Sequence, residues 1–268
     1  MAHLEVLSRP AHPRVQLPRE RVPLLFVHGA YVGAWCWEAH FLDWFAERGY
    51  PAHAVSLRGH GRSEGRDQLD AFGLADYAED VRQVVASLPQ PPVLVGHSMG
   101  ALVVQKALEA PGAAAPAMIL ACPVPSYGLL PSSFSLAMTR PALFAGMNDI
   151  ANGGRAAPHV IAEALFSESH DPAKVDACYR CMQRESRRAL FDMAGWGLPM
   201  PWRLQRPPTL VLGAGKDALF SIHEAQATAR LLGAEFRSVP ELGHGIMLDT
   251  GWERAAEAMA AWLGALGL

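Results

Sequence analysis

A serine between two glycines is the first feature of the chain that could do chemistry. In Gly96-His97-Ser98-Met99-Gly100, an apolar run precedes the serine and a pattern with helical spacing follows it. Such a sharp strand-to-helix turn exposes the serine hydroxyl in a strained backbone conformation, at a helix N-terminus that favours negative charge. The amide of Met99 is then directed into the same space. We therefore interpret Ser98 as a nucleophile and Met99 as one donor of an oxyanion hole.

A serine hydroxyl needs a base, and the base needs an acid that orients it. Asp217 and His244 each follow an apolar run of strand type, and a glycine stands on either side of His244. If those runs belong to one parallel sheet, both side chains lie at the edge that also carries Ser98. We expect Asp217 to orient His244, in the chain order serine, acid, histidine. Two other aspartates are alternatives for the acid, Asp192 and Asp249.

These residues fall at the ends of elements that alternate along the chain. Apolar runs of strand type occupy residues 24–27, 50–57, 93–95, 117–121, 209–213 and 235–239. Patterns with helical spacing occupy residues 35–45, 74–88, 98–110, 222–232 and 251–265. Strands that are apolar throughout are typical of parallel sheets with helices on both faces. The sequence therefore predicts an α/β fold built on a doubly wound, mostly parallel sheet.

The alternation stops in the middle of the chain, where proline, glycine, methionine and aromatic residues are frequent. Within this stretch only the pieces near 158–166 and 172–190 have helical patterns. We predict a core formed by residues 1–122 and 209–268, with residues 123–208 inserted into it as a helical cap.

Five motifs occur in an order that resembles the α/β-hydrolase superfamily. They are FVHGAYVGAWCW, LRGHGRSEG, LVGHSMGALV, VLGAGKDALF and ELGHGIMLD, and together they span residues 24 to about 262. The resemblance implies the α/β-hydrolase fold with Ser98, Asp217 and His244 as the triad. The first motif is also similar to the branch that contains plant esterases and hydroxynitrile lyases.

The resemblance adds expectations for two loops. The residue after His-Gly in such proteins usually supplies the second oxyanion amide, which here is Ala30, and His28 supports that loop. Relatives commonly carry an aspartate two residues before the arginine of the Arg-Gly-His-Gly turn, where this chain has Ser56. That departure leaves the ion-pair partner of Arg58 to be identified.

Aromatic and methionine side chains in the predicted cap favour an apolar substrate pocket, because methionine forms adaptable apolar walls. Its expected lining comprises Tyr31, Met138, Phe144 and Trp196. We expect a small-molecule ester with an apolar or aromatic group as substrate. The expected reaction proceeds through an acyl-enzyme and needs no metal and no organic cofactor.

Other chemistry on the same fold stays open at this stage. The alternatives are hydrolysis of a C–C bond, a thioester or a lactone, perhydrolysis, and hydroxynitrile lysis. Hydroxynitrile lyases add a lysine near the base, and Lys216 is the nearest candidate in this sequence. A non-catalytic ligand receptor on the same fold is the alternative from another functional class.

The composition argues against several other classes of protein. A net charge of −3 over 268 residues, with 18% charged residues, gives no basic field for nucleic acid. No run approaches the roughly 20 apolar residues of a membrane span, and the N-terminus lacks a signal-peptide core. We therefore expect a cytoplasmic protein without stable membrane association, and a homo-oligomer stays open. We interpret the C-x-x-C formed by Cys178 and Cys181 as packing in the cap, not as a metal or redox site.

Overall fold

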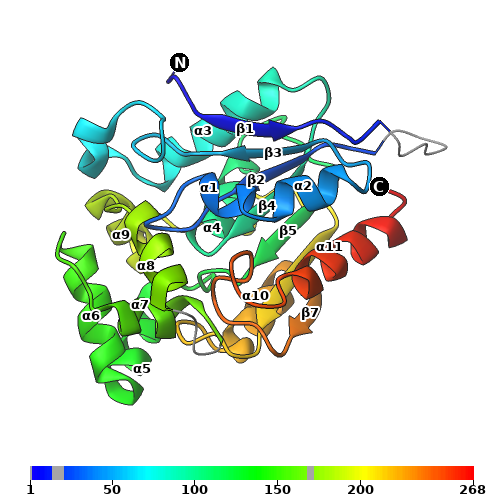
Figure 1. Cartoon of the computed structure of the whole chain (residues 1–268). Helices are drawn as coiled ribbons and strands as arrows, with labels where there is room; N and C mark the ends of the chain where they lie inside the picture. Colours follow the sequence, from blue (N-terminus) through cyan, green and yellow to red (C-terminus); the bar gives the residue numbers. More distant parts are fainter. Residues whose placement is uncertain (1, 14–20, 168–171) are drawn as a thin grey trace.

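A seven-stranded sheet forms the centre of the computed structural model, which describes residues 2–13, 21–167 and 172–268 (Figure 1). The sheet order is β1-β3-β2-β4-β5-β6-β7, with β1 antiparallel to β3 and every other neighbouring pair parallel. The strands are β1 (Val6–Arg9), β2 (Leu24–Val27), β3 (Ala52–Val55), β4 (Val93–His97), β5 (Met118–Ala121), β6 (Thr209–Ala214) and β7 (Glu235–Val239). The predicted mostly parallel sheet is confirmed.

Strand β1 is the strand that the sequence did not predict. Its four residues, Val-Leu-Ser-Arg, lie at the sheet edge and are exposed or half-buried. It therefore lacks the continuous apolar run that marks the fully buried strands β2, β4 and β5.

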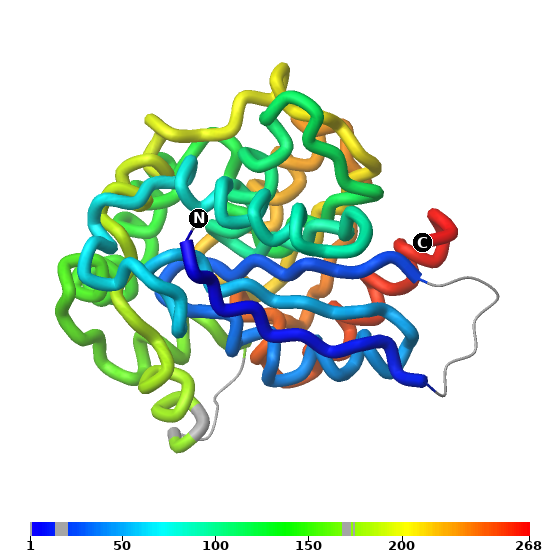
Figure 2. Tube along the Cα trace, turned by 90° about the horizontal axis from the view of Figure 1, so that it is seen from above, coloured from blue at the N-terminus to red at the C-terminus, as the bar shows by residue number. Residues whose placement is uncertain are grey.

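Helices cover both faces of the sheet (Figure 2). One face packs against α1 (Trp35–Glu38), α2 (Phe41–Ala46) and α11 (Glu253–Ala265) through an apolar cluster that includes Trp37, Phe41 and Trp262. The other face packs against α3 (Leu74–Ser87), α4 (Met99–Ala107) and α10 (Ile222–Leu232) through a second cluster that includes Leu74 and Leu102. This arrangement is the predicted doubly wound fold. The expected helix over 35–45 is divided into α1 and α2.

The chain between β5 and β6 forms a helical segment at one end of the sheet (Figure 1). Its helices are α5 (Leu129–Thr139), α6 (Pro141–Ala151), α7 (Pro158–Leu165), α8 (Pro172–Cys181), α9 (Arg187–Phe191) and the short π-helix η2 (Asp192–Trp196). They share an apolar cluster that includes Leu143, Ile150 and Ile161. The division of the chain into a core and a cap stays a prediction, and residues 168–171 of the predicted cap lie outside the described residues.

Helices α5 and α6 were not predicted because each contains a proline near its start. Pro131 lies in the first turn of α5, and Pro141 is the first residue of α6. The first turn of a helix tolerates proline because its amides have no intrahelical acceptor. The same prolines suggested breaks when only the sequence was considered.

Two further observations concern the cysteines and the helices. Cys36 and Cys122 are buried free thiols, whereas Cys178 is half-buried and Cys181 exposed on α8. Over the residues that the structure describes, no helix has both the length and the apolarity to cross a membrane.

Candidate active site

Ser98 stands at the junction of β4 and α4 in a conformation that few residues other than glycine adopt. Its φ is 52° and its ψ is −116°, and its amide donates to the carbonyl of Ala121 at 3.0 Å. The flanking glycines are required because the strand and the helix nearly touch. A Cβ atom at Gly96 would overlap the carbonyl of Gly100, and one at Gly100 would overlap the carbonyl of Val27. The turn therefore has the expected strained geometry.

Replacing Gly100 with alanine should destabilise the whole fold. The added Cβ meets backbone oxygens that cannot move aside, so we expect a loss of about 3 kcal/mol or more in the free energy of unfolding, measured by urea denaturation. Gly264→Ala in α11 is the matched control, because its Cβ would meet no atom within 4 Å. That control should gain up to about 1 kcal/mol from helix propensity. Equal stability of the two variants would contradict this account of the turn.

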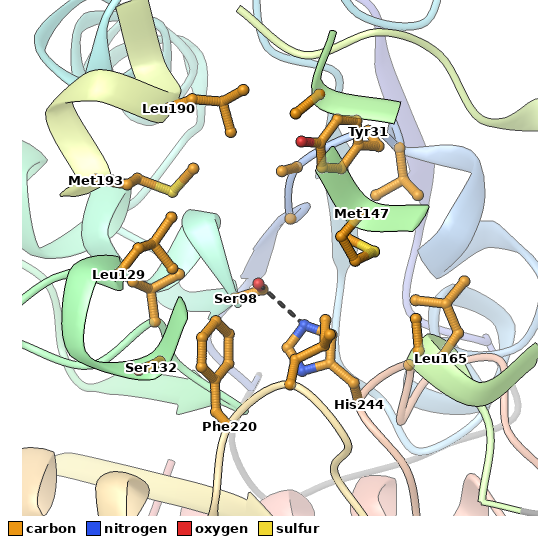
Figure 3. Close-up of a pocket in the computed structure, with 18 of the residues that line it drawn as sticks. Tyr31, Ser98, Leu129, Ser132, Met147, Leu165, Leu190, Met193, Phe220 and His244 are labelled. Atoms are coloured by element: carbon orange, nitrogen blue, oxygen red, sulfur yellow. Dashed lines mark hydrogen bonds between the residues drawn. The ribbon is translucent and has the colours of Figure 1, made fainter. Parts of the chain in front are cut away.

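The structure brings Ser98, His244 and Asp217 together at the carboxyl end of the sheet. His244 Nε2 lies 3.0 Å from Ser98 Oγ (Figure 3). On the other side of the ring, His244 Nδ1 lies 2.8 Å from Asp217 Oδ2. Both bonds are satisfied when the neutral imidazole carries its proton on Nδ1 and accepts at Nε2. Ser98 and His244 are buried, at 8% and 3% exposed. This is the arrangement of nucleophile, base and orienting acid.

The loop after β6 fixes the Asp217 carboxylate from its other side. Asp217 Oδ1 accepts hydrogen bonds from the amides of Leu219 and Phe220 at 2.8 and 2.9 Å, which leaves Oδ2 for His244. The two alternative acids, Asp249 and Asp192, form hydrogen bonds with other groups. Asp249 accepts from the amides of Gly243 and Ser167, and Asp192 accepts from the amide of Leu74 and from Arg188.

His97 contacts the predicted base, His244, and this contact was not predicted from the sequence. Its Nε2–H donates to the carbonyl of His244 at 2.8 Å, and the two ring centroids lie 4.8 Å apart. Burial lowers the pKa of His97 to about 3, helped by the neighbouring His244, so the ring is neutral at physiological pH. The position directly before the nucleophile was the available signal.

Cys122 also lies beside the triad. It directly follows β5 with a φ of 44°, and its thiol lies beside the Asp217 carboxylate. Burial first, and the Asp217 charge second, raise the pKa of this thiol well above its usual value. Donor atoms of Cys122, Asp217 and His244 lie within 4.8 Å of one another, which would suit a small metal site. The donors do not fit one well, because Asp217 and His244 already hydrogen-bond to each other and the amides of Leu219 and Phe220 occupy the other carboxylate oxygen.

Two backbone amides are available near the nucleophile. Ala30 lines the cavity above Ser98, and Met99 is the first residue of α4. Neither amide donates to another group in the part of the chain that the structure describes. His28 supports the first loop, since its Nδ1 donates to the carbonyl of Gly29 at 2.7 Å and its Nε2 accepts from Leu57 at 3.0 Å. Burial lowers the pKa of His28 to about 3, which keeps it neutral.

A strap of residues 183–186, between α8 and α9, binds the loops that carry Ala30 and His60. The Glu185 carboxylate accepts from His60 Nε2 at 3.0 Å, from the Tyr77 hydroxyl at 2.8 Å and from the amide of Tyr31 at 3.3 Å. The amide of Gln183 donates to the carbonyl of Tyr31 at 2.8 Å. This network was not predicted from the sequence, because Glu185 follows no strand that would place it beside His60.

The Glu185–His60 pair is buried and charged. Burial alone would raise the pKa of Glu185, but His60 and the Ser186 amide outweigh it and lower that pKa. Burial alone would lower the pKa of His60, but Glu185 outweighs it and raises that pKa. Both groups are therefore stabilised in their charged forms, with neither side chain exposed to solvent.

Replacing Glu185 with alanine should cost about 3–5 kcal/mol of unfolding free energy, because it leaves His60 and Tyr77 buried without their partner. In wild type, the raised pKa of His60 contributes stability that is complete below pH 6.5 and disappears as pH rises through that raised pKa. The lowered pKa of Glu185 contributes stability above pH 4.5, which disappears as pH falls through that lowered pKa. Glu185→Gln should lose less unfolding free energy than Glu185→Ala, and its stability should no longer decrease as pH rises above 6.5. Urea denaturation at pH 6 and pH 9 measures the unfolding free energy of each protein. An equal change between these two pH values in wild type and Glu185→Gln would refute the predicted pH dependence.

A cavity of about 310 Å³ lies above Ser98. Leu129, Met147, Leu165, Leu190 and Met193 surround the serine in Figure 3. These five residues come from α5, α6, α7, α9 and η2, in that order.

Two of the four predicted pocket residues line this cavity and two do not. Tyr31 and Phe144 are lining residues. Met138 and Trp196 are not, and their assignment to the pocket is corrected: they are 71% and 66% exposed. Met138 lies on the outer face of α5, and Trp196 stacks on Phe191 at the surface, with ring centroids 4.6 Å apart.

The position that lacks the usual aspartate is occupied by a different set of bonds. Ser56 Oγ donates to a carboxylate oxygen of Glu5 at 2.7 Å and accepts from the amide of Ala34 at 3.0 Å. Arg58 finds its partner on α3, where its guanidinium lies 2.6 Å from the carboxylate of Asp80. The loop that carries Ser56 and Arg58 therefore has hydrogen bonds and an ion pair although it lacks the usual aspartate.

Residues 24–262 match the model of the alpha/beta hydrolase family. Methylesterase 3 of Arabidopsis thaliana is 35% identical over 88 residues, which are 32% of this chain and 33% of that protein. Non-heme chloroperoxidase of Burkholderia pyrrocinia is 36% identical over 84 residues, which are 31% of this chain and 29% of that protein. The chain thus matches about a third of the length of these curated relatives.

Solved structures of the same architecture superpose over nearly the whole chain. An esterase from Exiguobacterium antarcticum has a TM-score of 0.76 and 19% identity, over 98% of this chain and 96% of that one. Est816, described as an N-acyl homoserine lactone degrading enzyme, has a TM-score of 0.68 and 20% identity, over 98% and 96%. At such identities the likeness shows the fold.

Proposed function

Because the chain belongs to the alpha/beta hydrolase family, as its five ordered motifs predict, we propose that it is a serine hydrolase of carboxylic esters. The similarity to the plant esterase branch is confirmed by the matches to methylesterases. One observation carries the proposal: Ser98, His244 and Asp217 form a continuous hydrogen-bonded chain whose serine opens into an apolar cavity. Small-molecule esters with an apolar or aromatic group fit that cavity.

The proposed reaction begins when Ser98 Oγ attacks the ester carbonyl and its proton moves to His244 Nε2. Asp217 keeps the other ring nitrogen protonated and stabilises the imidazolium that forms. The carbonyl oxygen becomes an oxyanion, which the amides of Ala30 and Met99 bind. Loss of one such donor typically costs about 10²–10³ in rate.

The tetrahedral intermediate then collapses to an acyl-enzyme. His244 returns its proton to the leaving alcohol oxygen as the C–O bond breaks. A water molecule, deprotonated by His244, next attacks the acyl carbonyl, and the acid departs as Ser98 recovers its proton. The neutral state of His97 suits this cycle, because a second cation beside His244 would oppose formation of the imidazolium.

The position of Lys216 argues against hydroxynitrile-lyase chemistry. That chemistry was expected to need a lysine near the base. Lys216 does not line the cavity, and its ammonium pairs with Glu241 at 3.1 Å at the surface. Thioester, lactone or C–C bond cleavage and perhydrolysis use the same nucleophile and base. They remain alternatives that would change the substrate but not the catalytic residues.

Turnover combined with covalent labelling tests the proposal. Wild type should hydrolyse p-nitrophenyl butyrate and form one covalent adduct with a fluorophosphonate probe, located on Ser98 by peptide mass spectrometry. A receptor on the same fold would show no turnover. Labelling of any other residue, or of none, would refute the assignment of the nucleophile.

A further inference from the structure

The wall of the cavity contains few polar side chains apart from Ser98, His244 and His97. They are Tyr31, Ser132, Ser133 and Asn148. The Ser132 hydroxyl donates to the Glu224 carboxylate, so its proton is not available to a substrate. Asn148 is exposed, and its amide donates to the carbonyl of Phe144 in its own helix.

Apart from the buried Nδ1 of His97, the Tyr31 hydroxyl belongs to the most buried side chain of the wall whose polar group has no partner among the described residues. Tyr31 is 7% exposed, whereas Ser133 is only half-buried. The hydrogen bonds between Tyr31 and other described residues involve its backbone alone. Figure 3 shows its hydroxyl directed into the cavity, towards the side where Leu190 and Met193 lie.

The backbone holds Tyr31 in this position at a conformational cost. Its φ is 67°, a left-handed value that costs a non-glycine residue on the order of 1–3 kcal/mol. The strap binds the residue from both sides, through Glu185 at its amide and Gln183 at its carbonyl. A bulky side chain kept in such a conformation is preorganised, so little entropy is lost when it binds a ligand.

The chemical state of this hydroxyl defines what it can bind. Burial, and then the Glu185 charge, raise the pKa of Tyr31, so the group is a neutral phenol at physiological pH. A phenol in an apolar wall donates one hydrogen bond. A substrate that displaces the water at this group and offers no acceptor leaves the hydroxyl unpaired, which costs about 1–3 kcal/mol.

We propose that Tyr31 determines the specificity of the cavity by donating a hydrogen bond to an oxygen on the apolar part of the substrate, away from the ester. The inference rests on the proposed esterase function and narrows its substrate class. The preferred esters carry one ether, carbonyl or hydroxyl oxygen on an otherwise hydrocarbon acyl or alcohol group. Plain alkyl esters of the same size are poorer substrates.

An oxygen scan tests this inference. One series consists of p-nitrophenyl hexanoate and the esters in which an acyl methylene beyond C2 is replaced in turn by an ether oxygen. A second series makes such replacements in the hexyl group of hexyl butyrate, again only beyond C2, so that every compound is a simple ester with one ether oxygen. For each ester, kcat/KM relative to its hydrocarbon parent is measured in wild type and in Tyr31→Phe. Dividing the two ratios cancels the intrinsic reactivity of the ester.

The ratio for at least one oxygen position should fall by about 10-fold in Tyr31→Phe, because the phenylalanine ring keeps the shape and loses the donor. Tyr179→Phe is the matched control. It removes a hydroxyl from α8 that does not line the cavity, and it should keep the wild-type ratios.

Two different failures can be told apart. Ratios in Tyr31→Phe that stay within about 2-fold of wild type at every position would overturn the role of Tyr31. The esterase function would stand in that case, because wild type would still hydrolyse the parent esters. Absence of Ser98-dependent hydrolysis of every ester would instead refute the proposed function and the inference with it.

Discussion

Replacing Ser98 with alanine should lower kcat for p-nitrophenyl butyrate by about 10⁵–10⁶-fold and abolish fluorophosphonate labelling. The alanine removes the only atom that His244 Nε2 contacts in the triad. Without it no acyl-enzyme can form, and the remaining rate comes from binding and the oxyanion donors alone. The measurement is steady-state turnover on highly purified protein, with far-ultraviolet circular dichroism to verify the fold.

Ser135→Ala is the control for this experiment. Ser135 is exposed on α5 and lies outside the cavity wall, so its loss should leave turnover and labelling as in wild type. If Ser98→Ala kept more than about a hundredth of the wild-type rate, the serine mechanism would be wrong.

Replacing Asp217 with asparagine should lower kcat by about 10⁴-fold. Asparagine keeps the shape of the side chain, and its carbonyl can still accept from Leu219 and Phe220. Its NH₂ group would then face His244 Nδ1 and favour the tautomer with the proton on Nε2, which cannot accept from Ser98. The rate should therefore fall with little change in stability.

Asp249→Asn separates the orienting acid from the aspartate that supports the His244 loop. Asp249 accepts from the amide of Gly243 beside the base, so Asp249→Asn should lower the free energy of unfolding in urea. Its kcat should fall less than that of Asp217→Asn. The double variant Ser98→Ala, Asp217→Asn should be no slower than Ser98→Ala alone, because the residues act as one unit. A larger rate loss in Asp249→Asn than in Asp217→Asn would make Asp249 the orienting acid.

Residues that follow buried parallel strands could be placed from the sequence because such strands are recognisable and their carboxyl ends share one edge. That reasoning brought Ser98, Asp217 and His244 together across 146 residues of chain. It could not find the Glu185–His60 pair, because Glu185 follows no strand and lies in a polar stretch of sequence whose pattern does not show that Glu185 and Ser186 are buried.

Composition also could not decide which face of a helix meets the cavity. Leu136 and Met138 are both apolar residues of α5, yet Leu136 lines the cavity and Met138 faces outward. The apolar stripe formed by Leu130, Phe134 and Met138 follows helical spacing and is largely exposed. Periodicity identifies such a stripe but does not show whether it packs against the protein or faces solvent.

The strap at residues 183–186 has a consequence for recombining this protein with others. A chimera that exchanged residues 123–208 for the corresponding part of another hydrolase would remove Gln183 and Glu185 with it. Tyr31 would then lose both groups that hold its backbone, and His60 would remain buried without a carboxylate. Crossover points that leave residues 183–186 on the recipient side would preserve those bonds, so the unit that can be transplanted is shorter than the insertion itself.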